Sequence, residues 1–336
     1  MTALPVLRTS ERSSFLRCPQ QWWWAYRCGL APKFKQADAR WFGIGVHIAF
    51  AEWYKYGKRR GPHPAETFAD WISDEIVYAK TWLDDRYEEA AWEDCRELGI
   101  SMLEGYVNHW GRDSQWSIIS VEQPFSIRVT HKGKPIAVFT SRWDAILRSE
   151  VNGRIYLLEH KTTNQVNTAY LAMDPQAGAY WAVADPILRK KHILKAGEEI
   201  AGIQYNFLRK AMKDERPQND EGQYLNKNGS VSARQPPPRF VRPDPIERSP
   251  AERKTQLLRL ADEVRMMNGI RAGELPILKN QTKDCPYCDF WDMCNAHERG
   301  GDAYKAIMKA LYTQRDPYLD ENKSSLCNFP RTLSRN

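Results

Sequence analysis

The chain has 336 residues, 42% of them apolar, with 49 basic and 42 acidic residues and a net charge of +7. This apolar content excludes an intrinsically disordered chain, and no apolar run reaches the roughly 18 residues of a membrane span. The moderate basic surplus is compatible with a polyanionic partner but does not require one. Residues 1–8 lack the apolar core of a secretory signal, so we expect a cytoplasmic protein.

Hydrophobic periodicity divides the first two thirds of the chain into helices and strands. Spacings of three or four predict helices over 10–28, 41–56, 64–83 and 86–110. From residue 117 the period changes to two, which predicts strands over 118–129, 136–147 and 154–160, the first two joined by a turn at 131–134. A helix over 168–184 and a strand over 200–208 follow. The predicted order is therefore helices, three strands, a helix and a strand.

The last third is less regular. Residues 211–250 are rich in proline, asparagine, glycine and arginine, which predicts a mobile insertion or one that orders on a partner. A helical pattern resumes over 250–268, a cysteine cluster follows, and residues 311–336 are predicted to be a tail. We expect a helical part (1–116), a core (117–210), the insertion (211–250), and a helix with the cysteine cluster (251–310).

Two acidic residues and a lysine stand out in the predicted strands. Glu159 and Lys161 end an apolar run, and because side chains alternate along a strand they project from the same face. Asp144 on the preceding strand supplies a second carboxylate. Such a group can hold a hard divalent cation beside an amine, which suggests phosphodiester hydrolysis. The alternative is a solvated charge pair, the interpretation favoured for the E-x-K triplets at Glu252 and Glu321.

Seven cysteines in a chain without an export signal favour metal binding over disulfides. Cys285, Cys288 and Cys294 have the spacing C-x2-C-x5-C, which leaves one ligand to be found elsewhere. The candidates, in order of preference, are Cys18, Cys28 and His297. The aromatic neighbours of the trio would exclude water, which favours an iron–sulfur cluster over a structural zinc. A link to Cys18 would join the two ends of a domain.

Together these features resemble the RecB-like branch of the PD-(D/E)XK nuclease superfamily, particularly its iron–sulfur members among the CRISPR-associated, AddB and phage exonucleases. The matching elements, in order, are Cys18-Pro19, Gly43-Ile44-Gly45-Val46-His47, Asp144, Glu159-His160-Lys161-Thr162, Gln176-Ala177-Gly178-Ala179-Tyr180 and the cysteine trio, within about residues 9–300. The sequence departs from the family at His160, where small or apolar residues are commoner, and over 213–250, which matches nothing.

The resemblance implies an α/β (α+β) restriction-endonuclease-like fold. Its core would be a central mixed sheet in the order α-β-β-β-α-β, flanked by an N-terminal helical region and a C-terminal iron–sulfur site. It also implies a single nuclease domain over residues 1–310.

The resemblance also implies a role for each motif. Asp144, Glu159, the His160 carbonyl and His47 would bind Mg²⁺ or Mn²⁺, the imidazole making manganese acceptable. Lys161 would orient or deprotonate the attacking water, Gln176 would hydrogen-bond near the metal, and Tyr180 would contact nucleic acid. Cys18, Cys285, Cys288 and Cys294 would hold a [4Fe-4S] cluster. The alternatives are a core histidine at His47, and a capping glutamine and core tyrosine at Gln176 and Tyr180.

The implied activity is that of a metal-dependent DNA exonuclease in phage or bacterial recombination, repair or replication. Alternatives are a structure-specific endonuclease, a non-catalytic DNA-binding iron–sulfur subunit and a zinc-containing binding module. The expected partner is DNA, either single-stranded or with a free end. Because no G-x-x-x-x-G-K-[ST] motif occurs in the chain, any unwinding motor is expected to be a separate helicase or recombination protein.

Overall fold

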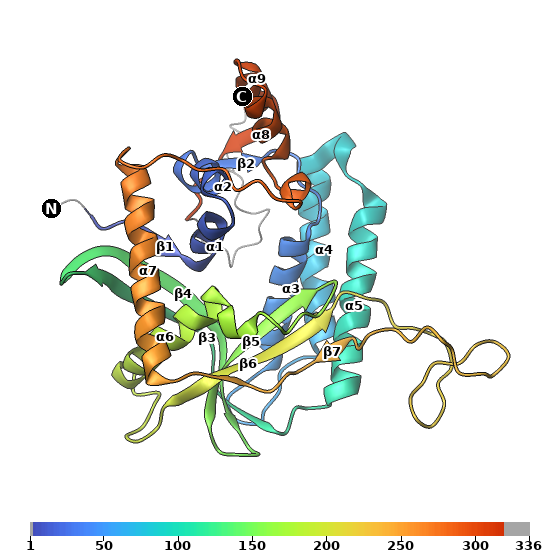
Figure 1. Ribbon diagram of the computed structural model, residues 1–336. Helices are drawn as coiled ribbons and strands as arrows, with labels where there is room; N and C mark the ends of the chain where they lie inside the picture. The colour runs from blue at the N-terminus through green and yellow to red at the C-terminus, as the bar shows by residue number, and fades with distance from the viewer. Residues whose placement is uncertain (1–2, 319–336) are drawn as a thin grey trace.

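A computed structural model describes residues 3–318 and shows a mixed β-sheet between two layers of helices (Figure 1). The strands of this sheet are β1 (Val6–Arg8), β3 (Trp116–His131), β4 (Lys134–Ser149), β5 (Ile155–Thr163), β6 (Ile200–Arg209), β7 (Phe240–Val241) and β8 (Ile246–Glu247). Their order is β1-β4-β5-β6-β7, with β3 paired to β4 and β8 to β6. Strands β3, β4 and β5 are antiparallel, whereas β5 and β6 are parallel and are connected through a helix. The predicted mixed α/β core is confirmed.

The helices are α1 (Thr9–Arg17), α2 (Pro19–Trp22), α3 (Ala39–Trp53), α4 (Pro64–Leu83), α5 (Glu89–Trp110), α6 (Pro175–Lys190), α7 (Pro250–Arg271), α8 (Trp291–Glu298) and α9 (Ala303–Leu311). Helices α3, α4 and α5 stand on one side of the sheet, and α6 and α7 on the other (Figure 1). No helix within residues 3–318 is both long and apolar enough to cross a membrane.

The predicted helix over 10–28 is interrupted. Helix α1 ends at Arg17, Cys18 is extended with φ −161° and ψ 113°, and α2 begins at Pro19 before the chain continues as a π-helix over Trp23–Arg27. The ring of a proline disfavours helical geometry in the preceding residue, whereas proline fits the first turn of a new helix. Cys18-Pro19 therefore places the cysteine at a break between helices.

The predicted helix over 168–184 begins later than expected. A short 3₁₀ turn over Leu171–Met173 comes first, and α6 starts at Pro175 with Asp174 as its cap. The Asp174 carboxylate accepts hydrogen bonds from the backbone N–H groups of Gln176 and Ala177. This cap sets the orientation of the first turn of α6, which carries Gln176.

Alternation along β5 assigns its side chains to the two cores. Leu157 packs in the core shared with α6 and α7, whereas Tyr156 and Leu158 pack in the core shared with α3, α4 and α5. Since the side-chain period of a strand is two residues, Glu159 and Lys161 lie on the α6 side. His160, on the other face, lies on the α3 side.

The N- and C-terminal parts of the described chain are joined outside the main sheet. Strand β2 (Leu30–Pro32) pairs antiparallel with β9 (Tyr312–Gln314), and Gln20 donates a backbone hydrogen bond to the Leu278 carbonyl. The prediction of a tail from residue 311 is therefore wrong for 312–314. Three-residue strands carry no readable period of their own and form because a partner is present. The rest of the predicted tail, 319–336, lies outside the described residues.

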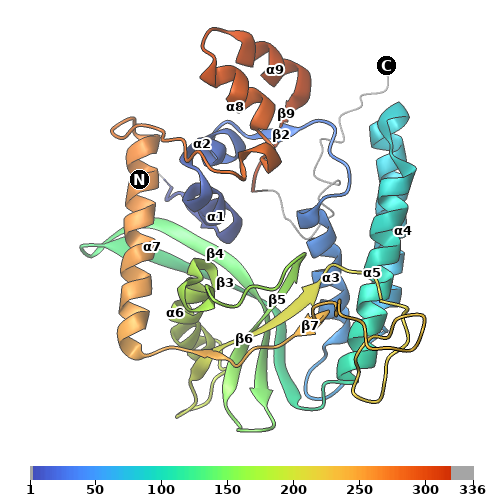
Figure 2. The same ribbon diagram turned by 45° about the vertical axis from the view of Figure 1, so that its right-hand side comes forward.

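The predicted insertion over 211–250 is only partly an excursion. Strands β7 and β8 at its C-terminal end pair with β6 and extend the sheet. The remainder projects from the body as a loop (Figure 1), closed by isolated bridges between Gln218 and Tyr224 and between Leu225 and Val231. Its mobility stays a prediction. In Figure 2, turned by 45°, the same loop lies in front of α5.

Two glycines of the α3 motif allow a direct test of the packing of α3 against α4. A methyl group on Gly45 would lie 2.1 Å from a ring carbon of Trp71 and 2.8 Å from one of Phe68, whereas on Gly43 it would meet only the Thr162 hydroxyl at 3.4 Å. We expect Gly45→Ala to lower the free energy of unfolding by about 1–3 kcal/mol through overpacking. Gly43→Ala should raise it by up to about 1 kcal/mol, because alanine is the better helix former. Urea denaturation of both variants tests this, and equal effects would contradict the packing.

Candidate functional site

The candidate site occupies a gap along one edge of β4. Residues 138–140 of β4 pair with β1, and residues from 145 onward pair with β5, so within the described chain 141–144 have no strand partner on that edge. Ala145 pairs with Leu158 at the end of the β4–β5 ladder. Asp144 and Glu159 are thus the next residues along the two strands as these separate. By strand alternation the two side chains lie on the same face of the sheet, and Asp144 is near enough to help raise the pKa of Glu159.

Asp144 connects α3, β4 and β5. Its Oδ1 lies 3.1 Å from His47 Nδ1, and its Oδ2 accepts a hydrogen bond of 2.8 Å from the backbone N–H of His160. Burial alone would raise the pKa of Asp144, but the charged His47 lowers it to about 2. Burial likewise lowers the pKa of His47, but Asp144 raises it to about 9. At neutral pH the pair is therefore a carboxylate and an imidazolium when no cation is bound.

Glu159, Lys161 and Gln176 form a closed triangle of hydrogen bonds. Glu159 Oε1 accepts from Lys161 Nζ at 2.7 Å and from Gln176 Nε2 at 2.8 Å, and Lys161 Nζ also donates to Gln176 Oε1 at 3.2 Å. Burial raises the pKa of Glu159 to about 7, with Lys161 opposing the shift and Asp144 adding to it. Burial lowers the pKa of Lys161, but Glu159 raises it above its ordinary value. Lys161 is therefore held as an ammonium group.

Glu122 on β3 is a site residue that the sequence analysis missed. It lies across the ladder from Asp144, between Val121 and Gln123, which pair with Ala145 and Trp143. Its φ of 48° is in the left-handed region, a strained conformation for a residue with a side chain and one that is common at functional sites. Burial and then Asp144 raise the pKa of Glu122.

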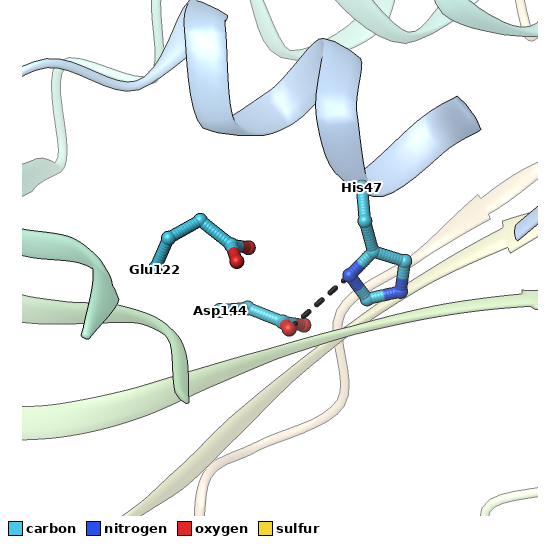
Figure 3. A group of neighbouring side chains, drawn as sticks. All are labelled: His47, Glu122 and Asp144. Carbon is cyan, nitrogen blue, oxygen red and sulfur yellow. Dashed lines mark hydrogen bonds and ion pairs between the residues drawn. The ribbon is translucent and has the colours of Figure 1, made fainter. Parts of the chain in front are cut away.

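Figure 3 shows Glu122, Asp144 and His47 converging from two strands and a helix. One ligand atom from each of the three lies within 4.8 Å of the other two, the only such group of three or more potential metal ligands among residues 3–318. An imidazole nitrogen with carboxylate oxygens is a donor set that suits Mn²⁺ and accepts Mg²⁺. The arrangement can hold a divalent cation beside the Lys161 ammonium.

His160 is packed as a neutral ring behind the site. Its ring stacks on Phe50 with centroids 4.3 Å apart, and Nδ1 accepts from the Asn206 amide at 2.9 Å. Asn206 Oδ1 accepts in turn from Arg242 Nε at 3.0 Å. Burial lowers the pKa of His160 to about 3. The ring lies on the α3 face of β5 with its centroid 6.0 Å from that of His47, while the backbone N–H of His160 donates to Asp144.

Arg242 anchors this arrangement from the end of the insertion. Its guanidinium lies 3.9 Å from the ring centroids of Trp110 and Trp116 and forms an ion pair of 2.5 Å with the buried Asp113. The histidine that departs from the family pattern is thus part of a buried polar network from β5 to the residue after β7. No local sequence signal linked these positions, because they are far apart along the chain.

Tyr180 lies on the same face of α6 as Gln176 but is buried, with 6% of its surface exposed. Its hydroxyl oxygen is 2.7 Å from that of Ser141, which also accepts from Thr9 at 2.8 Å. Ser141 lies in the stretch of β4 that has no strand partner on the edge facing the gap. Tyr180 therefore lines the inner wall of the gap, and the predicted contact with nucleic acid remains a prediction.

The cysteine trio lies near Cys18. Burial raises the pKa of Cys294, Lys279 opposes this, and Cys18, Cys288 and Cys285 raise it further, so the four thiols interact. No three of them have sulfur atoms mutually within 4.8 Å.

The other two candidates for the fourth ligand are placed differently. Cys28 packs against the same hydrophobic cluster as Cys288 and Cys294, but no cysteine is among the groups that shift its pKa, which burial raises. His297 Nδ1 accepts a hydrogen bond of 3.0 Å from Lys279.

Comparison with known proteins gives one family. The chain matches the model of the PD-(D/E)XK nuclease superfamily over residues 9–295. No curated protein matches it. Among solved structures, a protein from Eubacterium rectale with the provisional name of exonuclease aligns with a TM-score of 0.29 and 11% identity, over 75% of this chain and 92% of that chain.

Binding of Mn²⁺ should strengthen as the pH rises, because the cation competes with protons held by His47, whose pKa is about 9, and Glu159, whose pKa is about 7. The dissociation constant is expected to rise about tenfold for each pH unit below 9, and more steeply below 7, where two protons compete. Calorimetric titration between pH 6 and pH 9 measures this.

Two variants identify the groups responsible for this pH dependence. His47→Asn should remove the dependence between pH 7 and pH 9, and Glu122→Gln should weaken binding by about tenfold. Affinity that does not change with pH would contradict the assignment of these ligands.

Proposed function

This chain belongs to the PD-(D/E)XK nuclease superfamily, and we propose that it is a Mg²⁺- or Mn²⁺-dependent exonuclease that hydrolyses phosphodiester bonds from DNA ends. The observation that carries the proposal is the convergence of Asp144, Glu159 and Lys161 beside His47 at the gap in β4. Resemblance to the RecB-like branch supports cutting from an end.

The donor groups fit a divalent cation. His47, Glu122 and Asp144 bring one nitrogen and carboxylate oxygens within 4.8 Å of one another. The raised pKa of Glu159, caused first by burial, also reflects the neighbouring Asp144. A bound cation would lower the pKa of Glu159, because it favours the charged carboxylates. When bound, it would polarise the scissile phosphate and lower the pKa of a water ligand.

The remaining side chains have roles that follow from their charge and position. Lys161, held as an ammonium beside Glu159, would hold the attacking water and offset the negative charge that develops on the phosphate. Gln176 holds both groups in place through its two hydrogen bonds. His160 supplies its backbone carbonyl as a further candidate ligand, while its ring maintains the strand from behind.

We also propose that Cys18, Cys285, Cys288 and Cys294 hold a [4Fe-4S] cluster. The C-x2-C-x5-C spacing and the nearness of Cys18, whose thiol shifts the pKa of Cys294, support this proposal. The side chains that pack around Cys288 and Cys294 include Trp24, Phe290 and Met293. They would shield the cluster from water. The cluster would cross-link the two ends of the domain.

The wider setting is proposed from the resemblance. The substrate would be DNA, single-stranded or with a free end, and the process phage or bacterial recombination, repair or replication in the cytoplasm. A separate helicase or recombination protein would supply any unwinding. Residues 1–310 would form one nuclease domain, with 211–250 as an insertion.

Asp144→Asn and Lys161→Ala should each lower the rate of DNA hydrolysis by at least about 10²–10³-fold, because the first removes a charge that holds the cation and the second a charge that offsets the developing negative charge on the phosphate. The assay uses end-labelled linear DNA and covalently closed circular DNA with Mg²⁺ or Mn²⁺. Asp262→Asn, on the exposed face of α7, is the matched control and should keep full activity. Full activity of Lys161→Ala would contradict the mechanism, and cleavage of circles would indicate an endonuclease.

Anaerobically purified protein should contain iron and sulfide, and Cys288→Ala should lose both together with most of the soluble protein. Cys95→Ser is the control, because Cys95 lies on α5 and no cysteine is among the groups that shift its pKa, which burial raises. Metal and sulfide analysis of the three proteins measures this. Zinc in place of iron, or a soluble Cys288 variant with an intact cluster, would exclude the proposed site.

A further inference from the structure

Two hollows in the surface meet between α1 and α3. The first, of about 600 Å³, is lined by His47, Asp144 and Gln176, and the second, of about 500 Å³, extends toward the cysteine trio. Ser10, Ser13 and Ile44 line both hollows, which therefore adjoin, and together they are called the α1–α3 groove. Figure 2 shows α1 and α3 on either side of this region, with β2 and α8 beyond it.

The end toward the cysteine trio is the more basic of the two. The end at the site balances the acidic Glu52, Glu122 and Asp144 against Arg8, Arg142 and His47, and it would receive the divalent cation. The far end carries more basic than acidic groups. Its charged lining residues are Arg17, Lys35, Arg40, Arg315, Asp38 and Asp289. Arg17 and Arg40 are exposed. A polyanion that placed one phosphate at the cation would bring its neighbouring phosphates to these arginines.

An exposed aromatic ring stands at the far end. Tyr287 lines the groove and is 85% exposed, although large aromatic side chains are usually covered in a folded protein. Exposed aromatic rings beside basic groups are the usual platform for unpaired bases. Tyr287 lies between Cys285 and Cys288, so whatever holds these cysteines also sets the position of the ring.

We propose that the α1–α3 groove binds single-stranded DNA leading away from the scissile phosphate, with Arg17 and Arg40 contacting phosphates and Tyr287 stacking on a base. The proposal rests on the proposed nuclease function. Hollows of 500 and 600 Å³ are in the size range that encloses a small molecule. They can take a few nucleotides of one strand, whereas a duplex has to remain outside.

In this arrangement the cysteine site also affects the binding of substrate. The chain that carries the trio forms one wall of the groove through Tyr287 and Phe290, and Lys35 ties this wall to the start of α3 through ion pairs with Asp289 and Asp38. Breaking the link between the two ends of the chain would displace Tyr287 from the strand. The cysteine site would then contribute to substrate binding without taking part in the chemistry.

The test compares a long oligothymidylate with a small ester, bis(p-nitrophenyl) phosphate, which is too short to reach Arg17 and reports on the metal centre. The double variant Arg17→Gln/Arg40→Gln should raise KM for the oligonucleotide at least about tenfold. The slope of log KM against log salt concentration should fall by about 0.7 for each phosphate that the variant no longer neutralises. Arg265→Gln, exposed on α7, is the control and should change neither value.

Tyr287→Ala separates stacking from charge. It should raise KM for the oligonucleotide about tenfold while leaving the salt slope as in the unmodified protein, because stacking releases no counterions. A change in the salt slope alone would assign Tyr287 a different role and contradict the base platform.

The outcomes distinguish this proposal from the nuclease proposal. Unchanged KM and salt slope in the arginine variant, with both substrates hydrolysed, would overturn the groove and leave the nuclease standing. An equal weakening for blunt duplex and single strand would assign the groove to duplex DNA and overturn the single-strand proposal. If the unmodified protein hydrolyses neither substrate, fluorescence anisotropy of the labelled oligonucleotide still tests the groove: weaker binding by both variants supports it, and equal binding overturns it.

Discussion

The arrangement of the site depends on the hydrogen bond that the Asp144 carboxylate accepts from the backbone of His160. Where β4 and β5 separate, a buried N–H of β5 has no carbonyl opposite it, and an unpaired buried N–H is costly. Asp144 satisfies that group with one oxygen and pairs with His47 through the other. A single side chain therefore stabilises the opening of the sheet and brings α3 to it. Asp144 lies in the gap between β4 and β5 because the backbone N–H of His160 needs a hydrogen-bond acceptor there, and this position brings it to His47.

A second layer of buried groups holds this arrangement in place. On the α6 side, Gln176 fixes the separation of Glu159 and Lys161, and the Asp174 cap fixes the turn that carries Gln176. On the α3 side, Arg242 orients the Asn206 amide, which in turn selects the acceptor state of His160 Nδ1. Side chains that are held by hydrogen bonds from buried neighbours keep their geometry when a ligand binds. Precise positioning of a cation requires this.

The helices and long strands could be predicted because their signals are local. Alternation along β5 placed Glu159 and Lys161 on one face, and the turn at Lys132 and Gly133, both with positive φ, joined the first two strands as expected. The break at Cys18 could also have been read from the following proline. Strands β1, β2 and β9 could not be predicted, because segments of three residues are strands only where a partner lies beside them.

Glu122 is the clearest example of a candidate site residue that the sequence alone could not place. The hairpin turn pairs His131 with Lys134, a register that would put Glu122 opposite Trp143, but a shift between Val129 and Thr130 moves it opposite Asp144. No local sequence signal near the turn predicts that register shift. By itself the sequence determined the order of elements, the two carboxylates with their lysine, and the cysteine spacing, because these depend on neighbours along the chain. Only the tertiary structure decided that Glu122 joins them, that His160 is held from Arg242, and that α1 and α3 enclose a groove, because these depend on register and on packing between distant segments.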